Sequence, residues 1–193
     1  MSEYKIVFLT DGVVTLRPVL REDIPFFLAC INDPSVRKYV RNYMPMMELD
    51  EENWLKRLTD KRDTNICFAI EVDGKIVGTM GIHNIEWKDR VGTTGAMIKD
   101  VDNRGKGYGT RAKMLLLYHA FYECNLRKIR SSAIAFNTAS IRFNEKCGYK
   151  REGVLRQEIF SNGEYHDQVM SAVFREDFEP LWEAHKEKYN IVL

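Results

Sequence analysis

NRGKGYGT, residues 103–110, places three glycines at alternate positions beside two basic residues. Glycine costs conformational entropy, so a cluster of it marks a tight turn or a place where a ligand approaches the main chain closely. The stretch follows a predicted strand and runs into a predicted helix over 109–124. Backbone N–H groups lack partners at a helix N-terminus, and the helix dipole favours anions there. The pattern therefore predicts a phosphate-binding turn, with a purely structural turn as the alternative.

Two common phosphate-binding motifs do not fit these glycines. A P-loop needs the spacing GxxxxGK[ST], whereas Lys106 directly follows the first glycine and no Ser or Thr stands behind it. A dinucleotide fingerprint needs GxGxxG after the opening strand of a parallel domain, and here the third glycine comes one position too early. A protein that uses the loop for another nucleotide phosphate stays open as an alternative.

Predicted strands and helices alternate along the chain. Strands are expected at 13–19, 65–72, 75–86, 92–100, 127–136, 149–160 and 165–174, and helices at 21–32, 34–44, 49–61, 109–124, 138–146 and 176–189. Asp73-Gly74 predicts a hairpin turn, and Asp50 is expected to cap the third helix. The pattern predicts an α/β fold, with a mixed central sheet of about seven strands and helices on both faces.

Composition limits the classes of partner. The 193 residues suffice for one domain with a sizeable core, and 45% of them are hydrophobic. Lys and Arg number 29 against 28 Asp and Glu, which gives no broad basic surface for nucleic acid or an anionic membrane. The four cysteines form no CxxC pair, which favours reduced thiols in a cytoplasmic protein over disulfides or a metal site. No segment has the apolar length of a signal peptide or a membrane span.

Two motifs carry a resemblance to a known family. Arg104, Gly107 and Gly109 match R-x-x-G-x-G/A, the pyrophosphate-binding signature of the GNAT superfamily of N-acetyltransferases. Downstream, NTASIRFNEKCGYKREGVLR is similar to the N-x-x-S/A…E-K-x-G-F/Y segment of the same family. The chain resembles most the branch of ribosomal-protein N-terminal (RimJ/RimL-like) and spermidine acetyltransferases. The resemblance covers 13–175 as the acetyltransferase domain, with 176–193 as a C-terminal helix of the same domain.

The resemblance implies acetyl-CoA as co-substrate and no metal. Main-chain groups at the glycine turn would hold the pyrophosphate, the diverging strands and the following helix would hold the pantetheine arm, and a lysine would reach the 3′-phosphate. The residues implied are, for the pyrophosphate, Arg104, Gly105, Lys106, Gly107, Tyr108, Gly109 and Thr110; for the arm, Met97, Ile98, Lys99, Asn137 and Asn144; for the 3′-phosphate, Lys146. Helix capping by Asn137 and a favourable helix dipole at Lys146 are alternative reasons for those two residues.

The implied reaction is direct attack of a primary amine on the thioester in a ternary complex. Many relatives have a tyrosine as the acid four residues after the position of Ser140, whereas this chain has Asn144 there. Ser140 is therefore the expected acid, with water as the alternative proton source. Relatives often carry a glutamate where this chain has Thr94, so Glu86, on the preceding strand, is the expected base through a water.

The acceptor is expected to enter between the early helices and the last hairpin. The region expected to line its path offers mainly apolar and aromatic side chains, those of Tyr43, Met44, Met46, Met47 and Trp54. Such a surface suits a primary amine on an uncharged molecule or one of mixed charge better than a bare polyamine, which needs several carboxylates. A peptide or protein N-terminal amine ranks first, and a small amine such as spermidine second. A non-catalytic acyl-CoA-binding relative stays open, as does a homodimer.

Overall fold

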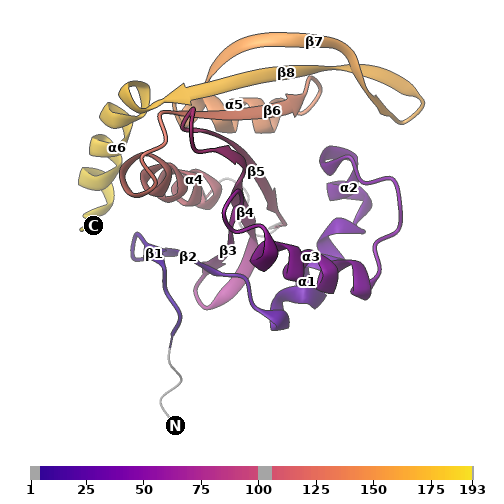
Figure 1. Ribbon diagram of the computed structural model, residues 1–193, viewed down its shortest axis with the longest axis horizontal. Coiled ribbons are helices and arrows are strands. Elements are labelled where there is room, and N and C mark those ends of the chain that lie inside the picture. The colour runs from indigo at the N-terminus through magenta and orange to yellow at the C-terminus, as the bar shows by residue number, and fades with distance from the viewer. Residues whose placement is uncertain (1–4, 100–105, 193) are drawn as a thin grey trace.

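Eight strands form one mixed sheet in the order β1-β2-β3-β4-β5-β6-β8-β7 (Figure 1). The computed structural model describes residues 5–99 and 106–192. The strands are Leu9–Thr10 (β1), Val14–Pro18 (β2), Ile66–Val72 (β3), Lys75–Glu86 (β4), Val91–Ile98 (β5), Lys128–Ile134 (β6), Lys150–Ser161 (β7) and Glu164–Phe174 (β8). The strand beyond the seven predicted is β1, whose two residues pair antiparallel with β2. Strands β5 and β6 pair in parallel.

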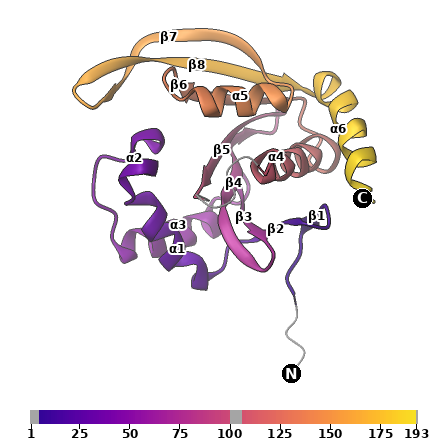
Figure 2. The ribbon, with the colours of Figure 1, turned by 180° about the vertical axis from the view of Figure 1, so that it is seen from behind.

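Helices lie on both faces of the sheet, as the sequence predicts. They are Ile24–Ile31 (α1), Pro34–Val40 (α2), Glu48–Asp60 (α3), Tyr108–Tyr118 (α4), Thr138–Lys146 (α5) and Arg175–Tyr189 (α6). In both ribbon views the strands β3–β5 run between α4 on one side and the group α1–α3 on the other (Figures 1 and 2). Within the described residues, no helix combines the length and the apolar character needed to cross a bilayer.

The main core lies between α4 and the sheet. Leu115 and Leu116 of α4 are fully buried with Leu16, Ile70 and Ile82 of the strands. After Tyr118 the helix continues as a π-helical segment, His119–Glu123, and α6 adds the buried rings of Phe178 and Trp182 to the same core. This packing fixes the axis of α4, whose first turn lies against Ile98 at the end of β5.

The ends of two helices differ from the sequence prediction. The prediction that Asp50 caps α3 is wrong, because Met47 occupies the cap position and α3 begins at Glu48. Asp50 is the third residue of the helix, and its carboxylate reaches back to accept the Met47 N–H at 2.9 Å. The second helix ends at Val40 rather than at residue 44, because Arg41 takes a left-handed conformation with φ 61°.

A buried ion-pair network holds the start of α1 against the sheet. Arg17 of β2 donates two hydrogen bonds of 2.8 Å to the carboxylate of Asp23, and a third of 2.9 Å to Glu71 of β3. Bidentate guanidinium–carboxylate contacts fix geometry as well as charge. The network thereby sets the position of α1, whose side chains reach the site described below.

Candidate active site

Strands β5 and β6 form a fork. They pair only from Val91–Lys128 to Thr93–Arg130, and beyond that point no register joins them. A cavity of about 530 Å³ opens where they separate, which we call the fork cavity. Of the residues predicted to meet a pantetheine arm or to act as acid, the structure brings five to this cavity: Met97, Ile98, Asn137, Ser140 and Asn144.

The main-chain groups of β5 alternate in direction. The Lys99 N–H donates to Val77 O of β4 at 3.0 Å, so this group is unavailable to a ligand in the fork. In an antiparallel pair, every second residue directs both main-chain groups to its partner strand. By that alternation Met97 also faces β4, whereas Ala96 and Ile98 face the fork. The predicted set of Met97, Ile98 and Lys99 is therefore corrected to Ala96 and Ile98 for main-chain contacts.

The side chain of Lys99 contacts the first two helices and does not line the fork cavity. Its Nζ lies 3.0 Å from Asp33 and 3.2 Å from the carbonyl oxygen of Ala29. These contacts tie the end of β5 to the first two helices. Hydrogen bonds from Ser35, which contributes most, and from Lys99 lower the pKa of Asp33 to about 2.

The helix α4 begins at the glycine turn. Gly107 is the cap residue with φ 81°, and no atom of residues 5–99 and 109–192 lies within 4 Å of the place where a Cβ would project. A Cβ on Gly109 would instead lie 3.0 Å from Ile98 and 3.5 Å from Phe143, so that glycine allows α4 to approach β5. Lys106, Tyr108 and Thr110 lie in or beside the first turn of α4, and Arg104 and Gly105 lie outside the described residues.

Two further predicted contacts sit on α5. Asn137 is the N-cap, and its Oδ1 accepts the Ser140 N–H at 3.1 Å, which confirms the capping interpretation. It lines the fork cavity at the same time. Lys146 lies exposed in the last turn of α5 and is absent from the lining of the fork cavity. Its contact with a 3′-phosphate stays a prediction.

A polar cluster occupies the closed end of the fork. Lys113 of α4 donates to Thr94 Oγ1 at 2.8 Å, and Thr94 Oγ1 also lies 2.8 Å from the Tyr149 hydroxyl. Asn144 donates to Ser131 Oγ at 3.0 Å. Burial lowers the pKa of Lys113 to about 8. Sequence reading missed Lys113, although its spacing of three and four residues from Leu116 and Leu117 places it on the buried face of the helix.

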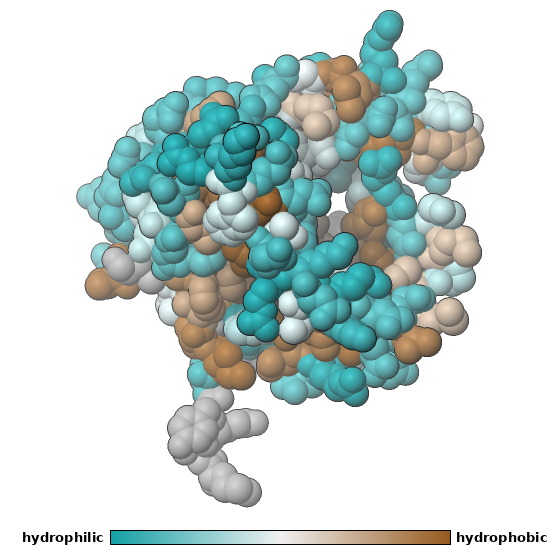
Figure 3. Space-filling model, viewed as in Figure 1, coloured by the Kyte–Doolittle hydropathy of each residue, from teal (hydrophilic) through white to brown (hydrophobic). Residues whose placement is uncertain are grey.

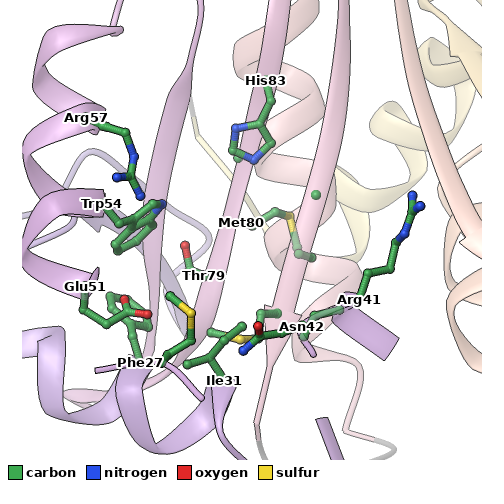
Figure 4. A pocket seen from close by; sticks show the side chains of 16 residues that line it. Phe27, Ile31, Arg41, Asn42, Glu51, Trp54, Arg57, Thr79, Met80 and His83 are labelled. Carbon is green, nitrogen blue, oxygen red and sulfur yellow. The ribbon is translucent and has the colours of Figure 1, made fainter. Parts of the chain in front are cut away.

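A second cavity, of about 450 Å³, lies between α1–α3 and the sheet, and we call it the helical cavity. Phe27, Glu51, Trp54 and Arg57 line it from the helices, and His83 lines it from β4. Figure 4 shows Glu51, Trp54 and Arg57 pointing from α3 toward the strands. The surface is visibly hollowed between these helices and the β7–β8 hairpin, with apolar residues inside the hollow (Figure 3).

The two cavities share a wall. Gly95, Ala96 and Met97 of β5 line both of them, together with Val40 and Arg41. A molecule in the fork cavity and a molecule in the helical cavity would therefore meet along this short piece of β5.

His83 stands beside that wall. A Cβ on Gly95 would lie 3.4 Å from its ring and meet nothing closer, so this glycine makes room for the imidazole. A Cβ on Gly81 would lie 3.2 Å from the ring and closer still to the Ile66 carbonyl oxygen of β3. Burial lowers the pKa of His83 below its ordinary value of 6.5. The imidazole is therefore neutral near pH 7 and able to accept a proton. Strand alternation predicts that His83 faces away from the core side chains of Met80 and Ile82, which is the signal that could have found it.

Glu51 brings a carboxylate into the helical cavity. The residue is 6% exposed, and burial, followed by the neighbouring charge of Asp50, raises its pKa. Among the described residues, no hydrogen bond or ion pair satisfies its side chain. A buried carboxylate without such a partner is costly, and a cation entering the cavity would compensate it.

The predicted base, Glu86, is not brought to either cavity. It lies at the end of β4 opposite Val91, where β5 and β6 are still paired. Its side chain is 56% exposed, and its carboxylate lies 3.8 Å from Arg130. Glu86 thus lines neither cavity, whereas His83 of the same strand lines the helical cavity.

Comparisons with known proteins agree with this geometry. A family model described as Acetyltransferase (GNAT) domain matches residues 14–150. The chain is 30% identical to the SPbeta prophage-derived uncharacterized N-acetyltransferase YokL of Bacillus subtilis, over 90% of this chain and 97% of that one. It is 29% identical to spermidine N(1)-acetyltransferase of Escherichia coli K12, over 86% and 88%. Mycobacterium smegmatis RimJ, solved in complex with CoA-disulfide, superposes with a TM-score of 0.77 at 23% identity, covering 91% and 90%.

Proposed function

Because this chain belongs to the GNAT family of acetyl-CoA-dependent N-acetyltransferases, we propose that it transfers the acetyl group directly to the N-terminal amine of a peptide or protein. The observation that carries this proposal is the shared wall at Gly95–Met97. The thioester would lie in the fork cavity and the amine in the helical cavity, so that the two reactants meet without a covalent enzyme intermediate.

The main chain at this wall suits the charge that develops during transfer. Attack on a thioester carbonyl creates a tetrahedral oxyanion, which preorganised N–H groups stabilise. Strand alternation aims the N–H of Ala96 at the fork, within the shared wall. We assign Ala96 this role, Gly107 and the first turn of α4 the pyrophosphate, and Ser140 a hydrogen bond to the departing sulfur.

The charged side chains that line the helical cavity favour an acceptor molecule that is not a bare polycation. Arg41 and Arg57 line the helical cavity beside its one buried carboxylate, Glu51. A neighbouring hollow of about 650 Å³, between α2 and the β7–β8 hairpin, is lined by Arg37, Lys38 and Arg41, and the lining holds no carboxylate among the described residues. A peptide with an amine at its N-terminus and acidic residues after it would match both features.

Acetylation of a polyamine is the second candidate. Glu51 beside the rings of Phe27 and Trp54 would bind one ammonium group, because aromatic faces attract cations. The E. coli relative at 29% identity is a spermidine acetyltransferase. Arg41 and Arg57 would face the remaining ammonium groups of a polyamine and repel them. This candidate therefore ranks below the first.

The deciding experiment measures thiol release from acetyl-CoA with three acceptors. These are spermidine and two peptides that share their first residue but carry either acidic or basic residues at the next two positions. We expect the acidic peptide to exceed both others in kcat/KM by at least about tenfold, which corresponds to about 1.4 kcal/mol of transition-state binding. A tenfold preference for spermidine would establish the second candidate instead.

Replacing Glu51 by Gln should weaken binding of the acceptor amine and leave the affinity for acetyl-CoA unchanged. The amide keeps the shape of the carboxylate but cannot compensate a positive charge, so we expect KM for the acceptor to rise about tenfold or more, as for a lost charged hydrogen bond. Steady-state kinetics with the preferred acceptor measures the change. Glu52→Gln is the matched control, since Glu52 pairs with the exposed Arg21 outside the lining of the helical cavity. Equal effects of the two substitutions would contradict the role of Glu51.

A further inference from the structure

Lys113 is an ammonium group buried at the closed end of the fork. It is 2% exposed, belongs to the buried face of α4, and contributes to the lining of the fork cavity. An ammonium group has three N–H donors. One of them bonds Thr94 Oγ1, and the Nζ lies 4.8 Å from the ring centre of Tyr149 and 5.3 Å from that of Phe143.

No anion compensates this ammonium within the part of the chain that the structure describes. None of the carboxylates in residues 5–99 and 106–192 forms an ion pair with it. The nearby titratable groups are the thiol of Cys147 and the hydroxyl of Tyr149, and burial raises the pKa of both, so they are neutral near pH 7. A buried cation without a counter-ion is unfavourable for folding, so a structural role does not account for it.

The cavity that Lys113 lines is the one in which the thioester would break. Ser140 and Asn144 border the same cavity from α5, and Asn144 stands where many relatives carry a tyrosine acid. Asn144 is 3% exposed, donates its amide hydrogen to Ser131, and cannot release a proton to sulfur. A hydroxyl such as that of Ser140 is far less acidic than a thiol, so it can donate a hydrogen bond but cannot by itself supply a proton.

We propose that Lys113 is the catalytic group that pairs with the coenzyme A thiolate as it leaves and gives it a proton. This inference rests on the proposed function. The amine nitrogen forms a bond with the carbonyl carbon, the carbon–sulfur bond breaks, and its electron pair goes to sulfur. A proton passes from Lys113 Nζ to sulfur, while the proton lost by the amine passes to His83. Solvent returns a proton to Lys113 and takes one from His83, so the net reaction yields the acetylated amine and free thiol.

The acidity of Lys113 suits this role. Its pKa of about 8, lowered by burial, is close to the value of about 8.5 for an ordinary thiol, so transfer of the proton is nearly balanced in energy. At pH 7 the group is mostly protonated, because the pH lies below that pKa. Thr94 holds the Nζ at the point where β5 leaves β6, and Tyr149, Phe143 and Cys147 are neutral, so no neighbouring anion competes with the thiolate.

The test measures the acidity of bound coenzyme A without any turnover. The ultraviolet absorbance of the thiolate is followed against pH with coenzyme A bound to the wild-type protein, to Lys113→Met and to Ser140→Ala. Lys150→Met is the matched control, because that lysine is 73% exposed and pairs with Asp177. We expect the thiol pKa to be about one to three pH units lower in the wild type than in Lys113→Met, as for an adjacent opposite charge, to rise by less in Ser140→Ala, which loses only a neutral hydrogen bond to sulfur, and to stay low in Lys150→Met.

Thermal unfolding of Lys113→Met accompanies the titration. Methionine has a similar length and no charge, so we expect an unchanged or higher Tm, together with a kcat about tenfold lower or more with the preferred acceptor. An equal thiol pKa in the wild type and Lys113→Met overturns the inference alone. Failure of the wild type to bind coenzyme A overturns the proposed function and this inference with it. A preference for succinyl-CoA over acetyl-CoA that Lys113→Met abolishes also overturns it, because the ammonium would then serve a carboxylate on the acyl chain.

Discussion

Replacing Gly107 by Val is expected to lower the affinity for coenzyme A by about a hundredfold or more. The glycine caps α4 with φ 81°, and no atom of the described residues occupies the space where its Cβ would project. We expect a pyrophosphate to bind the N–H groups at this helix N-terminus. A branched side chain would exclude the phosphates, and losing two charge-assisted hydrogen bonds of about 1.5–3 kcal/mol each accounts for the size of the effect. Isothermal titration calorimetry with coenzyme A measures it.

The control for this substitution must share its backbone strain. Gly163, in the turn between β7 and β8, has φ 86° and likewise no atom within 4 Å of a projected Cβ. Val in either position adopts a conformation that β-branched residues avoid, so both variants should lose a similar amount of Tm. Only Gly107→Val should lose affinity for coenzyme A. Equal affinities of the two variants would remove the turn from the cofactor site.

Local patterns predict most of the fold, and the exceptions have physical reasons. The hairpin turn at Asp73-Gly74 follows from residues that tolerate positive φ, and the structure has positive φ at both positions. Strand β1 was not predicted, since a two-residue pairing leaves no periodicity to detect. The start of α3 was misplaced because an acid at the third helical position and an acid at the cap give the same local sequence signal.

The site was predictable where it depends on a motif and unpredictable where it depends on tertiary packing. The glycine turn and the Asn137 cap are local, and the resemblance located both. The fork depends on how far β5 and β6 pair, which no single strand reveals. His83 and Lys113 belong to no motif, and each acquires its character from burial that only the folded chain provides. Glu86 is the nearest acid along the sequence to the expected strand, whereas in the folded chain it lines neither cavity.

Replacing His83 by Gln is expected to lower kcat/KM at pH 7 by about 10²- to 10⁴-fold, the usual contribution of a general base. Glutamine fills the space above Gly81 and Gly95 but cannot accept a proton from the attacking amine. The affinity for coenzyme A should stay unchanged, because His83 lines the helical cavity and not the fork cavity. Initial rates with the preferred acceptor, together with calorimetric titration of coenzyme A, measure the two quantities separately.

The pH dependence distinguishes loss of a base from simple loss of fit. Burial lowers the pKa of His83 below 6.5, so the neutral, active form persists at pH 7 and is lost only as the pH falls through the lowered value. An α-amine with a pKa of about 7.7–8.0 loses its own proton above that range, and the variant should then approach the wild-type rate. His166→Gln is the control, since that ring, on β8, bonds Ser161 O, packs on Phe136 and does not line either cavity. A defect in His83→Gln that is constant from pH 6 to pH 9 would show that the ring positions the acceptor and that another group takes the proton.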